Sequence, residues 1–270
     1  MAVLQKSWAS SSDCWSYWLV LSGAILGFGI TPPSADAQGQ VKPANPKQDR
    51  NAAAKQLRRI EGWGEVVDPD GDCKIERHNG GVLISVPGTV HDLYPPTKVN
   101  APRVQQDVEG DFSARVKVSG DFYPGKEPAR GFNRAYHGAG LLVWQDENNY
   151  VRLERMEVIW KKGKWKLSGR HWYYTPLLQQ RLGGDYEEFV AKGPSGTAFN
   201  QTAISLRLDR NGDMMSAYFS TDGQEWKLVK TFKSLTSKKV SIAVSALNGS
   251  NHEFNVSFDD FAITHKEANK

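Results

Sequence analysis

The chain has 270 residues, of which 24% are charged and 11% are aromatic, and its formal net charge at neutral pH is +4. Charges of both signs are interspersed, and no run of Lys and Arg is long enough to form a basic stripe, so we expect no nucleic-acid partner. Two cysteines in the whole chain exclude a disulfide-rich scaffold.

Residues 1–37 are predicted to be a secretory signal peptide. The apolar run Trp15–Ile30 is shorter than the ~20 residues that a membrane-spanning helix needs, and an A-x-A cleavage pattern stands at residues 35–37. The weakly basic start, with Lys6 and an opposing Asp13, leaves an uncleaved anchor open as the alternative. We expect a monomer that is secreted or lies in the periplasm or cell envelope, without membrane attachment once the signal is cleaved.

Residues 38–59 are expected to be a flexible linker, because they are rich in Gln, Pro, Asn and Lys and contain few large apolar side chains. The folded domain is expected at residues 60–265, with a short tail at residues 266–270. Cleavage of the signal leaves Cys73 without an internal partner. A hydrophobic core must therefore hold the fold together, and ~200 residues are enough to build one.

From residue 60 onward, short apolar or alternating runs recur between Gly, Asn and Asp turn signals. The runs expected to be strands are Glu65–Val67, Lys74–Arg77, Val82–Val86, Phe112–Val118, Leu141–Trp144, Tyr150–Met156, Trp165–Ser168, Ile204–Leu208, Met215–Phe219, Trp226–Phe232, Val240–Ala246 and Phe254–Ile263. Many short strands without a long 3.6-residue period indicate an all-β sandwich or barrel. Gly183–Asn200 has no clear period and is expected to be a long loop over one sheet.

The central stretch, residues 138–157, is predicted to be a hairpin whose loop is residues 146–149. A symmetric closure of this hairpin places the following side chains on a core-facing side: Leu142, Trp144, Val151 and Leu153. The other face then carries Tyr150, Arg152 and Glu154. An aromatic ring, a cation and an anion together are typical of a sheet that lines a polar groove. The alternative is a solvated face whose Arg/Glu pair contributes ~0–1 kcal/mol.

Sugar binding needs aromatic faces that stack on pyranose rings and planar polar groups that bond to hydroxyls. In the run at residues 171–174, alternate side chains share a face of a strand, and we assign His171 with Tyr173 to the groove. The alternative, in which this pair belongs to the core, stays open. The remaining candidates for the rim of the groove are His91, Arg103 and His137.

Carboxylates in a tight, glycine-containing turn indicate a cation site. Asp68, Asp70 and Asp72 form such a cluster, which suits a hard cation such as Ca²⁺. Asp259 and Asp260 form a second acidic step near the last predicted strand. The alternative is ordinary turn chemistry with solvated aspartates. Calcium is the one cofactor that the sequence indicates.

Catalysis by a retaining glycosidase requires two carboxylates ~5–5.5 Å apart. Glu154 and Glu157 are three residues apart and point to opposite faces of a strand, and the adjacent Glu187 and Glu188 fail for the same reason. Carboxylates from separate strands can still meet. We therefore expect a protein without catalytic activity, and a glycoside hydrolase or lyase that uses Glu154 is the alternative.

Several motifs together resemble the concanavalin A-like lectin/glucanase superfamily, in particular its bacterial single-domain members related to the C-terminal sandwich domain of β-xylosidases. These motifs are Val67–Cys73, Val86–Leu93, Asn100–Val104, Glu109–Phe112, Gly140–Trp144, Asn149–Glu154 and Phe258–Ile263. The resemblance implies a jelly roll of two antiparallel sheets, with the central hairpin in a concave sheet where sugars bind, and with calcium sites common. The Glu-x-Asp-x-x-Glu pattern of the superfamily's glucanases is absent, which argues against catalysis by their mechanism.

The leading hypothesis is thus a secreted, non-catalytic carbohydrate-binding β-sandwich that holds sugar on its concave sheet. Besides the enzyme alternative, a structural or partner-binding module of the cell envelope stays open. In that case the loop at residues 183–200 is expected to fill the groove.

Overall fold

The computed structural model describes residues 58–96, 98–160, 171–190, 202–235 and 237–265. In this part of the chain every regular element is a β-strand, and the described residues contain no helix able to span a membrane. The predicted signal peptide, nearly all of the linker, the strand expected at Trp165–Ser168 and the tail lie outside the described residues.

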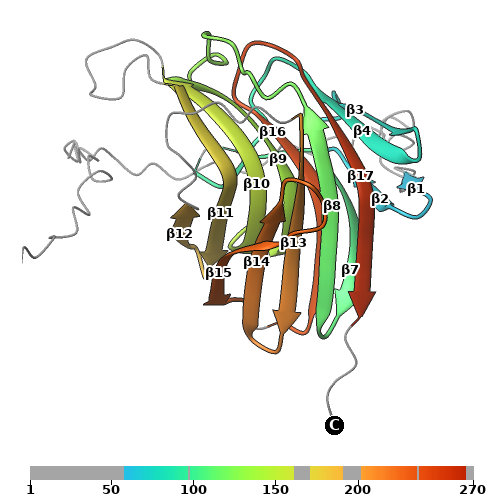
Figure 1. The fold of residues 1–270 in the computed structure, drawn as a ribbon. Coiled ribbons are helices and arrows are strands. Elements are labelled where there is room, and N and C mark those ends of the chain that lie inside the picture. Colours follow the sequence, from blue (N-terminus) through green and yellow to red (C-terminus); the bar gives the residue numbers. More distant parts are fainter. Residues whose placement is uncertain (1–57, 97, 161–170, 191–201, 236, 266–270) are drawn as a thin grey trace, which may run out of the picture. The chain divides into compact units, whose positions relative to one another are not determined.

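Two large antiparallel sheets pack face to face as a sandwich (Figure 1). The eight-stranded sheet contains, in spatial order, β1 (Arg59–Ile60), β2 (Gly64–Val67), β7 (Arg103–Glu109), β16 (Lys239–Asn248), β9 (Arg134–Asp146), β10 (Asn149–Trp160), β11 (His171–Leu182) and β12 (Asp185–Val190). The seven-stranded sheet contains β15 (Lys227–Lys233), β14 (Met214–Ser220), β13 (Ala203–Asn211), β8 (Phe112–Gly120), β17 (Phe254–His265), β4 (Gly81–Val86) and β3 (Lys74–His78). This architecture confirms the predicted all-β, two-sheet jelly-roll sandwich.

The main core lies between the inner faces of the two sheets. In β8, for example, Ala114, Val116 and Val118 are almost fully buried, whereas Arg115 and Lys117 between them are exposed. This alternation follows from the two-residue period of a strand, which sends successive side chains to opposite faces. The apolar side chains of β9 and β10 on the inner face meet the same core.

A second apolar cluster covers the other face of the eight-stranded sheet, called the outer face below. The covering segment (residues 90–96 and 98–101) connects β4 to β7 and carries the small hairpin of β5 (Leu93–Tyr94) and β6 (Lys98–Val99). Its Leu93 and Ala101 are fully buried in a cluster with Leu142 and Tyr150 of the sheet. The Tyr150 hydroxyl donates a hydrogen bond of 2.6 Å to the backbone carbonyl of Leu93. The covering segment is therefore held on the outer face.

The prediction of a long loop at residues 183–200 is wrong for its first half, which forms a turn and the strand β12. Gly183 and Gly184, with φ of 57° and 94°, form a tight turn that leads directly into β12, and β12 pairs along β11 at the edge of the sheet. Positive φ is easily adopted by glycine, which explains why the turn stands at this pair. Residues 191–200 lie outside the described residues.

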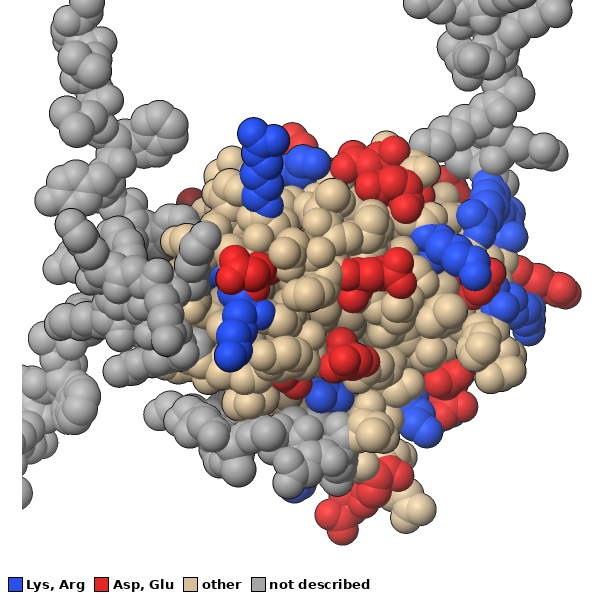
Figure 2. All heavy atoms as spheres, turned by 90° about the horizontal axis from the view of Figure 1, so that it is seen from above, with Lys and Arg blue, Asp and Glu red and all other residues tan. Residues whose placement is uncertain are grey.

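Charged side chains of both signs are scattered over the face seen in Figure 2, with neutral residues between them. This distribution agrees with the mixed charge pattern of the sequence.

Candidate functional site

The central hairpin closes asymmetrically. Asn149 pairs with Asp146, but the next residue, Tyr150, pairs with Trp144. This β-bulge shifts β9 by one residue relative to a symmetric closure, and such a shift moves every side chain of a strand to the other face. Trp144 and Leu142 therefore share the outer face with Tyr150, and the prediction that they face the inter-sheet core is wrong. The prediction for the β10 half of the hairpin is confirmed.

Tyr150, Arg152 and Glu154 lie side by side on the outer face, as the sequence predicted, but they do not line an open groove. Their exposed fractions are 0%, 6% and 0%, because the covering segment packs over them. A role for these three side chains in direct ligand contact stays a prediction.

A buried charge centre forms where the covering segment meets β10. We define it as Asp92, Arg152 and Glu154. Nη1 of Arg152 lies 3.7 Å from Oδ1 of Asp92 and 3.9 Å from Oε1 of Glu154, and its Nε donates to the side chain of Gln179. The Tyr136 hydroxyl donates to the other carboxylate oxygen of Asp92 at 2.8 Å. Sequence reasoning missed Asp92 in this role, since no local pattern places a loop carboxylate over a strand 60 residues away.

Burial dominates the electrostatics of this centre. Burial raises the pKa of Glu154 to about 7, because the neighbouring Arg152 offsets the loss of solvation only in part and Asp92 adds to the rise. Burial alone lowers the pKa of Arg152, but the charges of Glu154 and Asp92 more than reverse this effect and raise it above its ordinary value. Arg152 is therefore a fixed cation, whereas Glu154 titrates near neutrality.

A row of polar atoms across the outer face lacks hydrogen-bond partners among the described residues. It comprises Nη1 of Arg103, Oγ of Ser245 and both carboxylate oxygens of Glu154, all of them buried. Register places these residues in one row, since Gly140 pairs with Ser245 on one side and Glu154 on the other, and Ser245 pairs with Arg103. Each unsatisfied buried group costs about 1–3 kcal/mol. A polar occupant above Gly140 would satisfy several of them at once.

Arg103, predicted at the rim, lies at one end of this row. Its guanidinium stacks over the ring of Trp144 at 4.8 Å, and its Nε donates to Gln105 at 2.9 Å. Burial lowers the pKa of Arg103 to about 10, with the charge of Glu65 opposing that change. The side chain belongs to the packing of the outer face rather than to an exposed rim.

The predicted ligands His137, His171 and Tyr173 lie on the opposite face from the charge centre. The three residues surround Glu157 of β10, which pairs with His137 in β9 and with Tyr173 in β11. Nε2 of His171 lies 3.1 Å from Oε2 of Glu157, and its Nδ1 lies 2.9 Å from the Tyr173 hydroxyl. His137 stacks on Phe254 at 4.4 Å, and burial lowers its pKa to about 4. The assignment of this group to the same groove as Tyr150 is therefore wrong.

The acidic turn at residues 68–72 directs its carboxylates to three separate partners. Asp68 accepts two backbone N–H bonds of its own turn at 3.1 Å, and Asp70 accepts a bond of 2.6 Å from Asn100. Oδ1 of Asp72 lies 2.9 Å from Nε2 of His91, which places this predicted rim residue, fully buried, beside the acidic turn. Calcium at this turn stays a prediction, because no single point receives all three carboxylates.

One group of three potential metal ligands is close together within the described residues: Asp72, Cys73 and His91. The Cys73 thiol lies 3.6 Å from the Asp72 carboxylate, and burial together with the charges of Asp68 and Asp72 raises its pKa well above the ordinary value. A protonated thiol is a poor metal ligand. Metal binding at this group would therefore have to displace the thiol proton.

Asp259 and Asp260 lie at a β-bulge of β17. The acidic turn precedes the first residue of β3, whereas this bulge lies near the last residue of β3. Asp259 lies against Gly81, and Asp260 has a φ of 53°. The two acidic steps of the sequence are thus separate in the fold.

An aromatic cluster lies at the end of β9, β10 and β11, on the outer face. This aromatic end consists of Arg134, Trp160, Trp172 and Tyr174, all of them half-buried. The guanidinium of Arg134 lies 5.3 Å from the ring of Trp160. Trp172 and Tyr174 have near-parallel rings, 12° apart in orientation and 6.3 Å between centroids. The alternation at residues 171–174 correctly predicted that two pairs of side chains face opposite sides. The pair on the face of Tyr150 is Trp172 and Tyr174, not His171 and Tyr173.

Comparisons with known proteins identify the fold. The sequence matches no protein-family model and no curated protein. The structure is similar to that of a functionally unknown protein from Saccharomyces cerevisiae, with a TM-score of 0.55 and 14% identity over 76% of this chain and 98% of that chain. It is also similar to a mutant of the GH43 protein BlXynB from Bacillus licheniformis, with a TM-score of 0.50 and 14% identity over 78% of this chain and 38% of that chain. At these identities the similarity shows the fold alone, which is an all-β sandwich of two antiparallel sheets with a jelly-roll arrangement.

Proposed function

We propose that this protein is a secreted, non-catalytic carbohydrate-binding module that holds sugar at the aromatic end of its outer face. The observation that supports this proposal is the grouping of three half-exposed aromatic rings with a guanidinium on one face of a rigid sheet. Flat apolar rings stack on the C–H faces of a pyranose, and a guanidinium donates to its hydroxyls in a fixed plane.

The polar neighbours of the aromatic end suit a ligand with many hydroxyls. Tyr174 lies between two charges: burial and Glu188 raise the pKa of its phenol, and Arg134 opposes them. Nε1 of Trp172 is buried without a hydrogen-bond partner among the described residues. A sugar hydroxyl next to these groups accepts from the indole and from Arg134. In this proposal the charge centre acts indirectly, because Arg152 and Glu154 fix the covering segment that borders the aromatic end.

The test is retention of the full chain on a panel of polysaccharides, with and without calcium, for the wild type and for Trp172→Ala. We expect the substitution to weaken binding about tenfold, equivalent to ~1.4 kcal/mol. Trp226→Ala is the matched control, because Trp226 is also half-buried and stacks with an arginine, Arg207, at 4.7 Å, but lies just before β15, at the seven-stranded sheet. Equal loss in both variants, or no loss in Trp172→Ala, contradicts the proposed site. Dependence on calcium would support the predicted cation site.

A second candidate function, glycoside hydrolysis or lysis, is favoured by one observation. Asp92 and Glu154 come from separate segments, yet both lie within 4 Å of the same Arg152 nitrogen, and Glu154 has a pKa of about 7. A carboxyl group that stays protonated near neutrality suits a general acid. This candidate predicts release of reducing sugar by the wild type and its loss in Glu154→Gln. Binding without release supports the non-catalytic module instead.

A further inference from the structure

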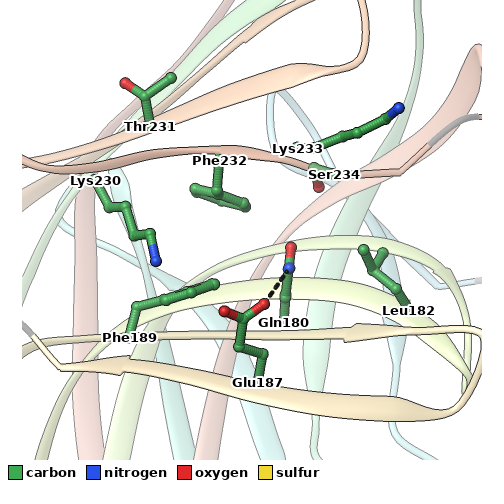
Figure 3. Close-up of a pocket in the computed structure, with 9 residues that line it drawn as sticks. All are labelled: Gln180, Leu182, Glu187, Phe189, Lys230, Thr231, Phe232, Lys233 and Ser234. Atoms are coloured by element: carbon green, nitrogen blue, oxygen red, sulfur yellow. Dashed lines mark hydrogen bonds between the residues drawn. The ribbon is translucent and has the colours of Figure 1, made fainter.

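A pocket of about 500 Å³ opens between the free edges of the two sheets, at the opposite end of β11 from the aromatic end. It lies between β11 and β12 on one side and β15 on the other (Figure 3). Small-molecule sites in proteins occupy about 300–1,000 Å³, so the pocket is large enough for a ligand.

The apolar part of the pocket is aromatic. Phe189 of β12 and Phe232 of β15 approach each other with ring centroids 5.6 Å apart and planes inclined by 36°. Leu182 extends the apolar wall on the β11 side (Figure 3). These side chains belong to the inner faces of the sheets, where the sandwich core ends. They suit a flat, apolar body of modest size.

Two buried polar atoms in this pocket have no hydrogen-bond partner among the described residues: Oε1 of Gln180 and Oγ of Ser234. The two residues are 5% and 3% exposed. The amide nitrogen of Gln180 already donates to Glu187 at 3.0 Å, so its orientation is set and its oxygen is left to accept. A ligand that donates a hydrogen bond would satisfy Gln180, and the same hydroxyl can accept from Ser234.

The pocket also contains a cation that can receive an anion. Nζ of Lys230 lies 3.5 Å from the centre of the Phe189 ring, and within the described residues it forms no salt bridge. Lys230 and Phe232 of β15 and Ser234 just beyond it point into the pocket (Figure 3), and the Cα atoms of Lys230 and Ser234, four residues apart in extended chain, are separated by about 13 Å. Glu187 is the opposing charge in the pocket and limits the attraction for an anion.

We propose that this pocket is a second binding site, for a small phenolic carboxylic acid. The aromatic body packs alongside the contacting rings of Phe189 and Phe232, the carboxylate pairs with Lys230, and the phenolic hydroxyl donates to Gln180 and accepts from Ser234. The ligand is elongated, since its two polar groups must reach opposite ends of the pocket. The site is independent of the proposed carbohydrate site, because it lies between the sheets and not on the outer face.

The experiment is calorimetric titration of the full chain with 4-hydroxycinnamate, with cinnamate, which lacks the hydroxyl, and with 4-hydroxycinnamamide, which lacks the charge. We expect 4-hydroxycinnamate to bind at least about tenfold more tightly than either analogue. Lys230→Met removes the ammonium but keeps most of the stem, and we expect it to reduce affinity for the acid about tenfold while leaving the amide unchanged. Ser234→Ala should reduce the preference for the hydroxylated acid over cinnamate.

The controls separate this site from non-specific charge and from the carbohydrate site. Lys227→Met removes an exposed lysine of the same strand outside the pocket, and it should bind 4-hydroxycinnamate like the wild type. Glu187→Gln should bind the acid more tightly, and Trp172→Ala should bind it unchanged. Absence of binding to the wild type, or equal losses in Lys227→Met and Lys230→Met, would overturn the proposal.

Discussion

Replacement of Glu154 by glutamine should change how the stability of the domain depends on pH. Burial raises the pKa of this carboxyl from 4.5 to about 7, so the folded state holds a proton that the unfolded state has already released. Between these two pKa values, the folded state binds more protons than the unfolded state. The stabilising contribution is therefore complete below pH 4.5 and is lost as the pH rises through about 7.

The size of this effect follows from the two pKa values. A difference between 4.5 and about 7 corresponds to about 3 kcal/mol, at ~1.36 kcal/mol per pKa unit. This conversion is appropriate because the side chain has no exposed surface. Glutamine keeps the shape of the side chain and cannot titrate, so Glu154→Gln removes this pH dependence.

His137 produces the opposite trend over nearly the same range. Burial lowers its pKa from 6.5 to about 4, although the backbones of Asp121 and His252 offset part of this effect. The unfolded state therefore binds more protons between pH 4 and 6.5, and the contribution of His137 to stability, also about 3 kcal/mol, is gained as the pH rises. In the wild type the two trends oppose each other, and their sum is nearly flat.

The assay is urea denaturation of the full chain at steps from pH 4.5 to 7.5. Between pH 4.5 and 7.5, we expect the free energy of unfolding of Glu154→Gln to rise by about 3 kcal/mol while that of the wild type stays nearly constant. The rise comes from His137, whose trend is no longer opposed. His137→Phe, which keeps a ring against Phe254, should show the reverse slope, and the double variant should regain the wild-type profile. Glu76→Gln, at an exposed carboxylate of β3, is the matched surface control. Parallel profiles for the wild type and Glu154→Gln would refute the reasoning.

Three further substitutions probe the outer face and its covering segment. Tyr150→Phe removes the 2.6 Å bond to the Leu93 carbonyl and should lower the free energy of unfolding by about 1–3 kcal/mol, measured by urea denaturation. Gly140→Ala places a Cβ in a steric clash with the Leu153 carbonyl oxygen, a backbone atom, so we expect loss of soluble folded protein, checked by circular dichroism. Arg152→Leu leaves two buried carboxylates without their cation and should cost about 3–5 kcal/mol, whereas an unchanged melting temperature would contradict the assigned charge centre.

The strand content was predictable from the sequence because alternation and turn residues report local geometry. In β8, charged and apolar residues alternate so regularly that the inner face is evident, and β13 follows the same pattern. By contrast, β7 was missed, since its run of Gln and Asp residues carries little apolar signal. The strand β12 was missed because Glu187 and Glu188 conceal an edge strand that has few neighbours to pack against.

The faces of the central hairpin were predictable only in part. Tyr150, Arg152 and Glu154 were assigned correctly because they belong to one strand, where alternation alone decides. The assignment of Trp144 failed because it depends on how two strands are aligned, and the bulge at Asn149 displaces that alignment by one residue. No residue in the turn predicts this bulge, so the sequence alone could not show which face of β9 packs against the core.

The burial of the charge centre was not predictable, because it depends on a contact between distant segments. The covering segment owes its place to Leu93 and Ala101, which pack on Tyr150 and its neighbours, and to Asp92, which meets Arg152. Each of these residues alone resembles an ordinary loop residue. Their effect appears only when β4 and β7 are placed on different sheets and the connection between them has to cross the outer face.

This arrangement assigns different roles to the charged and the aromatic residues of the outer face. A fully buried cation between two carboxylates costs desolvation energy and is difficult for a ligand to reach, so Arg152 is suited to holding Asp92 and the covering segment in place. Trp172 and Tyr174 are half-exposed and near-parallel, and their removal leaves no buried charge. Loss of sugar binding in Arg152→Leu would therefore report on folding, whereas the same loss in Trp172→Ala, with the fold intact, reports on the binding surface.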